Sequence, residues 1–163
     1  MNPLSIFKSP TRLLLAVLSA PLVAWAAPQL GQPLPEFTLK DQFEQPWGVE
    51  TGTKLMLFSA SRKASDLIQA VLGNQSKGFL ASRQAVYLAD MSRMPGFVTR
   101  TFALPVLRQM PFSVGVVLDE QLLADWPRQA DSVTVITLQN LRVSSVGFAA
   151  NEADLRTVLG ISP

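Results

Sequence analysis

The sequence contains no cysteine and no histidine among its 163 residues. Without cysteine the chain cannot form a disulfide, and it has no thiolate for redox chemistry or nucleophilic attack. Without histidine it lacks the side chain that proteins use most often as a metal ligand and as a general base near neutral pH. These absences exclude thiol-dependent catalysis and weigh against acid–base catalysis, so the sequence indicates a fold more readily than an activity.

Charged residues are also few. They make up 16% of the chain against 48% hydrophobic residues, which is typical of a folded protein, and the length fits one domain. No Gly-x-Gly-x-x-Gly segment is present to cradle a dinucleotide, so we predict no cofactor. Asp119, Glu120 and Asp125 lack the spacing of a calcium loop, so we predict no metal site. Trp47 and Trp126 do not lie among basic residues, so no nucleic-acid partner is expected.

The first 26 residues have the three parts of a secretory signal peptide. Residues 1–12 contain Lys8 and Arg12 but no acid, residues 13–23 form an apolar run, and Ala24-Trp25-Ala26 supplies small residues before the expected cleavage site. We therefore expect residues 1–26 to be a cleavable signal peptide, and the protein to be periplasmic or secreted.

The apolar run of this leader is short for a bilayer span and is interrupted by Pro21, which favours cleavage over retention as an anchor, the alternative. We expect one mature domain over residues 27–163, with no membrane span. Lys8 and Arg12 account for the excess of 14 basic over 12 acidic residues, so the mature domain is formally neutral. The pI of 9.3 therefore depends on the leader and does not indicate nucleic-acid binding.

The rest of the chain alternates between strand and helix patterns. The expected strands cover residues 37–40, the neighbourhood of Trp47, and residues 55–59, 85–90, 114–119, 133–138 and 141–146. The expected helices cover residues 61–72, 95–103 and 152–159, and residues 77–83 are expected to form a short helical piece or a loop. We expect Pro105 to break or bend the third helix, and Gln139-Asn140 to form a hairpin turn. This order predicts an α/β domain with a mixed sheet, an N-terminal β-hairpin, a βαβ unit and helices on both faces.

Gly31–Asp41 reads Gly-Gln-Pro-Leu-Pro-Glu-Phe-Thr-Leu-Lys-Asp. This segment is similar to the opening segment of peroxiredoxin-type and related exported thioredoxin-fold proteins, and two further segments extend the resemblance. The strand, turn and helix at Leu55–Leu72 fall where those proteins place a strand, the reactive cysteine and the first long helix. Thr134–Val143, with the helix after it, resembles their closing hairpin and helix. The resemblance implies a thioredoxin-like fold from Gly31 to Leu159.

The departures from that family concern its reactive groups. On a Cys-x-x-Cys pattern the cysteine positions fall at about Arg62 and Ser65, and Ser132 or a neighbour occupies the place of the proline that opposes the reactive turn. A serine hydroxyl needs a strong adjacent base to become a nucleophile, and none is evident here. We therefore predict an exported thioredoxin-fold protein without thiol redox activity, acting as a non-catalytic binding or accessory protein with an envelope protein as its partner.

A first candidate site is the turn formed by Ser61, Arg62, Lys63 and Ser65. A helix N-terminus favours anions, and two cations there oppose the helix dipole without an evident structural gain. The alternative function is therefore a small-anion-binding protein, or an enzyme, that uses this turn. The simpler interpretation carries more weight: Ser61 caps the helix while Arg62 and Lys63 point into solvent, since such charges change stability by less than about 1 kcal/mol.

A second candidate is a partner surface between Met91 and Phe112. Flexible apolar side chains interleaved with arginines can form an adaptable interface. The expected members of this surface are Met91, Met94, Phe97, Arg100 and Met110. The interpretation with more weight is that the apolar residues pack on the sheet while the arginines face outward, because apolar residues at helical spacing usually belong to a core.

Overall fold

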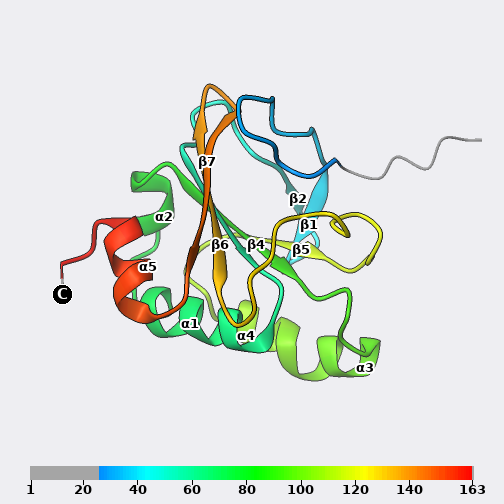
Figure 1. Ribbon diagram of the computed structural model, residues 1–163. Coiled ribbons are helices and arrows are strands. Elements are labelled where there is room, and N and C mark those ends of the chain that lie inside the picture. The colour runs from blue at the N-terminus through cyan, green and yellow to red at the C-terminus, as the bar shows by residue number, and fades with distance from the viewer. Residues whose placement is uncertain (1–25, 163) are drawn as a thin grey trace, which may run out of the picture.

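The computed structural model describes residues 26–162, so the expected signal peptide lies outside the described residues except for Ala26 (Figure 1). The described strands are β1 (Leu39–Asp41), β2 (Pro46–Trp47), β3 (Leu55–Ser59), β4 (Ala85–Asp90), β5 (Val114–Val117), β6 (Val133–Gln139) and β7 (Arg142–Ala149). The helices are α1 (Arg62–Leu72), α2 (Phe79–Ser82), α3 (Gly96–Val98), the π-helical turn η1 (Thr99–Ala103), α4 (Leu104–Leu107) and α5 (Glu152–Leu159).

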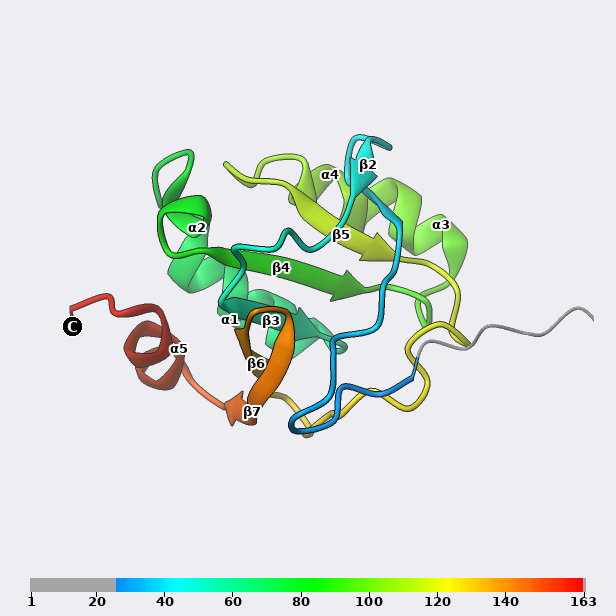
Figure 2. The same cartoon turned by 90° about the horizontal axis from the view of Figure 1, so that it is seen from above.

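The strands form one mixed sheet in the order β2-β1-β5-β4-β3-β6-β7. The central strands β3, β4 and β5 are parallel, and their arrows run in the same direction in Figure 2. β6 and β7 add an antiparallel hairpin beside β3, while β1 and β2 form the expected N-terminal hairpin beside β5. The predicted mixed sheet with flanking helices and a βαβ unit is therefore confirmed.

Local sequence signals explain the two longer helices. The Ser61 hydroxyl accepts a hydrogen bond of 3.2 Å from the Ala64 backbone N–H and caps α1, whose buried residues face the sheet. Asn151 caps α5 in the same way, and Gly160 ends that helix in the left-handed conformation with φ of 61°. The predicted starts and stops of these helices are confirmed.

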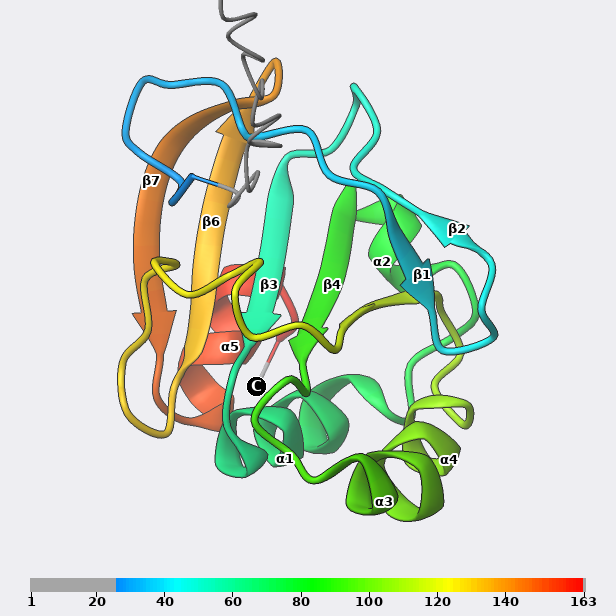
Figure 3. The ribbon, with the colours of Figure 1, turned by 90° about the vertical axis from the view of Figure 1, so that its right-hand side faces the viewer.

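The expectation of helices on both faces of the sheet is wrong. Buried residues of α1, α2, α4 and α5 all belong to the core on one face. Within residues 26–162 no helix contributes a buried residue to the second core, where Leu34, Leu123 and Trp126 lie on the sheet instead. Figure 3 shows the N-terminal segment and the loop between β5 and β6 crossing in front of the sheet, with α5 behind it. Loops therefore cover the second face of the sheet.

Pro105 does not end the helix in which it lies. The chain passes from α3 through the π-helical turn η1 into α4, with Pro105 in the first turn of α4. Proline has no N–H to donate, and its ring crowds the carbonyl group four residues earlier. A π-helical turn directly before the proline changes this hydrogen-bonding pattern locally, so the helix continues to Leu107.

The turn of the β6–β7 hairpin lies one residue later than predicted. Asn140 and Leu141 both have positive φ, of 51° and 58°, as the two central residues of a type I′ turn require. Leucine rarely adopts this conformation. The Leu141 carbonyl accepts a hydrogen bond of 2.7 Å from the Leu34 N–H, so the N-terminal segment holds the turn in place.

Candidate functional site

Polar side chains gather at the carboxyl ends of the parallel strands β3 and β4, where α/β proteins commonly hold a ligand. The turn after β3 contains the predicted site residues, and Asp90 ends β4. The loop before β6 lies opposite this turn, since Lys63 Nζ lies 3.3 Å from Asp131 Oδ2. The structure therefore brings three segments together that are well separated in the sequence.

The two cations of the predicted anion site each have an acidic partner. Arg62 Nε lies 3.8 Å from Asp66 Oδ2, one helical turn later, and Lys63 pairs with Asp131. Both side chains are exposed, to 90% and 65%, so these ion pairs contribute little to stability. Ser61 serves as the helix cap. These contacts account for the turn without a ligand, because its positive charge is offset within the chain.

Ser65, the fourth predicted residue, belongs to a cluster of three hydroxyl groups beneath α1. Ser59 Oγ lies 2.7 Å from the Tyr87 hydroxyl oxygen and 3.1 Å from Ser65 Oγ. Ser59 and Tyr87 are buried. Burial raises the pKa of the Tyr87 hydroxyl, and its hydrogen bonds with Ser59 and Ser65 offset part of that effect. Tyr87 is therefore neutral at physiological pH and cannot serve as the base that a serine nucleophile needs.

The place expected for a proline opposite the turn is occupied by Asp131 and Ser132. Ser132 is buried, and its hydroxyl donates a hydrogen bond of 3.1 Å to the Ala130 carbonyl. Asp131 has φ of 59°, which turns the chain into β6. No cis peptide bond occurs among residues 26–162. The loop thus presents a carboxylate to Lys63 where the family resemblance implies a proline.

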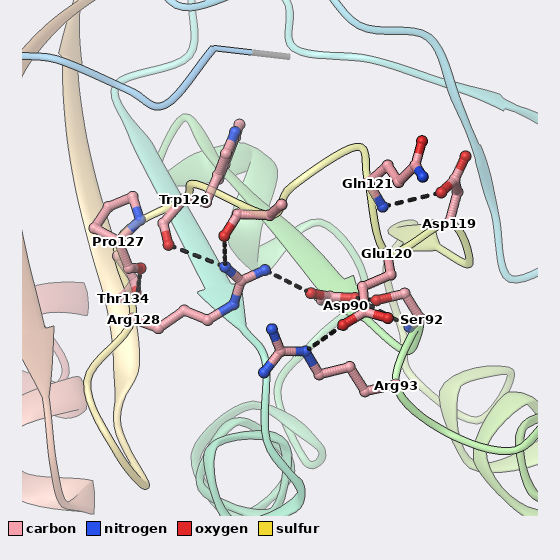
Figure 4. A network of polar contacts seen from close by, with 11 residues as sticks. Asp90, Ser92, Arg93, Asp119, Glu120, Gln121, Trp126, Pro127, Arg128 and Thr134 are labelled. Atoms are coloured by element: carbon pink, nitrogen blue, oxygen red, sulfur yellow. Dashed lines mark hydrogen bonds and ion pairs between the residues drawn. The ribbon is translucent and has the colours of Figure 1, made fainter. Parts of the chain in front are cut away.

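A buried ion pair that sequence analysis missed lies beside this turn (Figure 4). Arg128 Nη2 donates a hydrogen bond of 2.8 Å to Asp90 Oδ2, and the two side chains are only 22% and 3% exposed. Asp90 Oδ1 accepts hydrogen bonds from the Ser92 N–H, at 3.0 Å, and from the Ser92 hydroxyl, at 2.6 Å. Asp90, as a carboxylate at the end of a buried strand, could have indicated a buried ion pair, but its partner Arg128 lies 38 residues further along the sequence.

Arg128 also fastens the loop that covers the second face of the sheet. Its Nη1 donates to the carbonyl groups of Ala124, at 3.0 Å, and Trp126, at 3.1 Å. Its guanidinium carbon lies 5.3 Å from the centre of the Phe58 ring on β3. The contacts of this arginine run to β3, β4 and its own loop, and they indicate a structural role: without a helix, one buried cation holds the loop against the strands.

The predicted partner surface is only partly at the surface. Met91 and Met110 are buried in the helix-side core and Met94 is half-buried, so these methionines pack as the alternative interpretation expected. Phe97 and Phe102, in contrast, are 67% and 59% exposed, and their ring centres lie 6.1 Å apart in an edge-to-face arrangement. Arg100 is exposed between them. The structure therefore leaves an aromatic pair, rather than a methionine surface, open to solvent.

The described part of the chain also lacks two other classes of feature, metal-binding clusters and helices able to span a membrane. Residues 26–162 contain no group of three or more acidic side chains placed to share a metal ion. None of the helices in this range is sufficiently long and apolar to traverse a bilayer.

No protein-family model matches the chain, and no curated protein matches it. Several solved structures, in contrast, are similar to this chain. A peroxidoxin, BcpB from Mycobacterium tuberculosis, has a TM-score of 0.53 at 12% identity, covering 82% of this chain and 95% of that one. The exposed lipoprotein thioredoxin Etrx1 from Streptococcus pneumoniae has a TM-score of 0.51 at 15% identity, covering 77% and 99%. A putative thiol:disulfide interchange protein DsbE from Chlorobium tepidum has a TM-score of 0.50 at 18% identity, covering 82% and 100%. The chain has a thioredoxin-like fold, as the resemblance implied, in a form without cysteine.

Proposed function

We propose that this protein is a non-catalytic binding or accessory protein of the cell envelope, which keeps a thioredoxin-like scaffold for recognition. The observation that carries the proposal is the exposed pair Phe97 and Phe102 on the α3–η1–α4 segment. Two adjacent aromatic rings in water are unfavourable for an isolated protein, and aromatic residues with arginine are enriched in interfaces. In a chain without cysteine, this surface is a better candidate for function than the turn between β3 and α1.

The surroundings of the pair support recognition of a partner. Val106 adds a further exposed apolar side chain on the same helical segment. Arg100 has no carboxylate partner among residues 26–162, and residues 91–112 contain no acid. The segment lies at a corner of the molecule in Figures 1 and 3, where a partner can reach it. A partner surface with apolar and acidic residues would complement it.

Export is the second part of the proposal. It is supported by the signal-peptide pattern of residues 1–26 and by the exported nature of one fold neighbour, an exposed lipoprotein. Amino-terminal sequencing of the protein from the envelope fraction of its source is expected to begin at Ala27. A protein that retains Met1 and stays in the cytoplasm would contradict this part.

The partner surface can be tested by replacing Phe97 with a photoreactive phenylalanine analogue in living cells. Irradiation is expected to give one discrete adduct, which Phe102→Ala and Arg100→Glu each reduce. The matched control is the same analogue at Phe43, which is 52% exposed but lies in the β1–β2 turn. Equal labelling at both positions, or no adduct from Phe97, would overturn the proposed surface.

A further inference from the structure

A hollow of 760 Å³ lies at the opposite end of β3 from the reactive-turn position. It is bounded by β6 and β7 on one side and by the end of α5 and Arg83 on the other, and α2 and α5 lie on the same side of β7 in Figure 1. Its volume falls within the range of about 300 to 1,000 Å³ that is usual for small-molecule sites. Here the helices leave part of the helix-side face of β6 and β7 uncovered.

Gly147 leaves part of this hollow open. Gly147 on β7 is paired with Val135 on β6, so position 147 faces the same side of the sheet as Val135, which belongs to the helix-side core. A Cβ atom added at Gly147 would meet no atom within 4 Å. The backbone there is not in the left-handed region, so nothing in the strand conformation requires glycine. Glycine at this position therefore leaves space that the larger residues usual in strands would occupy.

The lining combines an apolar floor with a positive rim. Leu55, Val135 and Leu159 form the floor, and each packs in the helix-side core. Lys54 and Arg83 are the charged lining residues, and no acid lines the hollow. Neither cation has an ion-pair partner within residues 26–162. An uncompensated pair of cations beside apolar surface complements a ligand with an apolar chain and one negative charge.

Arg83 is already oriented by the protein. It donates a hydrogen bond of 3.2 Å to the Gly160 carbonyl, and its guanidinium carbon lies 5.3 Å from the centre of the Phe79 ring. A guanidinium group held in this way still has free N–H donors and matches a carboxylate in shape and charge. We propose that this hollow binds a linear apolar monocarboxylate, with the carboxylate on Lys54 and Arg83 and the chain along the floor. This site does not rest on the partner surface proposed above.

Titration calorimetry of the mature protein with decanoate tests the site. Decanoate is expected to bind and to raise the melting temperature, while decan-1-ol, decylammonium and propionate bind at least tenfold more weakly. Decan-1-ol lacks the charge, decylammonium reverses it, and propionate lacks the chain. Absence of decanoate binding at millimolar concentration would overturn the proposal, and so would equal binding of decan-1-ol or decylammonium.

Two kinds of variant locate the ligand. Gly147→Val places a branched side chain in the hollow and is expected to weaken decanoate binding by at least tenfold while folding normally, since valine favours strands. Ser145 lines the same hollow, so Ser145→Leu provides a second variant with a larger side chain there if Gly147→Val does not fold. Lys54→Glu is expected to weaken binding tenfold or more. Lys40→Glu, an exposed lysine on β1, is the matched control and is expected to bind as the unmodified protein does. Unchanged binding in the filled variants would overturn the site.

Discussion

The two ends of β3 differ in whether their positively charged side chains have acidic partners. At the carboxyl end, Arg62 and Lys63 each lie beside a carboxylate. At the amino end, Lys54 and the nearby Arg83 have no ion-pair partner among the described residues and border open space. The carboxyl end is where this fold class commonly holds its ligand, yet here it is filled by contacts within the chain. Position in the fold therefore does not by itself identify a site, and uncompensated charge beside open space favours the amino end as the candidate.

The carboxyl end carries two pairs of buried polar groups. Ser59 on β3 bonds to Tyr87 on β4, and Asp90 at the end of β4 bonds to Arg128 in the loop between β5 and β6. If these buried pairs are structural, removing them should reduce stability strongly, whereas changes to exposed charges at either end of β3 should leave stability nearly unchanged. The following predictions test this difference, starting with the largest expected effect.

Arg128→Ala is expected to lower the free energy of unfolding by about 3 to 5 kcal/mol, because Asp90 would keep a buried charge without its partner. Urea denaturation followed by tryptophan fluorescence measures the loss. The matched control is Arg93→Ala, which removes an exposed ion pair with Glu120 and is expected to cost less than about 1 kcal/mol. Similar losses in both variants would show that the buried pair has no special role.

Ser59→Ala is expected to lower the free energy of unfolding by about 1 to 3 kcal/mol, because it removes the 2.7 Å hydrogen-bond partner of the buried Tyr87 hydroxyl. Tyr87→Phe removes the other partner. The double variant should lose less than the sum of the single losses, since the two residues share one interaction. Additive losses in this double-mutant cycle would argue against the hydroxyl cluster.

The ionisation of Tyr87 gives a prediction without a mutation, since it is the single tyrosine of the sequence. Burial raises its pKa above the usual value of 10, so the folded protein keeps the proton that the unfolded chain releases. The contribution of Tyr87 to stability is therefore constant below about pH 10 and falls as the pH rises through its folded pKa. Ultraviolet titration of tyrosinate should show a higher midpoint in the folded protein than in urea. Equal midpoints would contradict the burial of this hydroxyl.

The smallest effects are expected at the exposed cations of the α1 turn. Arg62→Ala should change the free energy of unfolding by less than about 0.5 kcal/mol, because its ion pair with Asp66 is exposed. Millimolar phosphate, sulfate or dicarboxylates should leave the melting temperature unchanged if the turn binds no anion. A rise in melting temperature that Arg62→Ala and Lys63→Ala abolish would restore the turn as an anion site.

Sequence reasoning located most of the elements but not their layering. Strand and helix patterns predicted the strand order along the chain and the caps Ser61, Asn151 and Gly160, because these depend on residues close in sequence. It was wrong about the second face of the sheet, where helices were expected and loops, including the one containing Trp126, cover the strands instead. Which segments cover a face of the sheet depends on contacts between residues far apart in the sequence, and such contacts leave no hydrophobic periodicity in the local sequence.

Two properties of this protein follow from its sequence alone. A chain without cysteine or histidine cannot perform thiol chemistry in any fold, and amphipathic spacing around Lys54–Leu72 gives a strand followed by a helix. Tertiary structure alone pairs Asp90 with Arg128, joins Ser59 to Tyr87 and opens the hollow beside Gly147. The physical reason is that burial, charge pairing and empty space arise between segments that the sheet brings together, and residue order does not specify those distances.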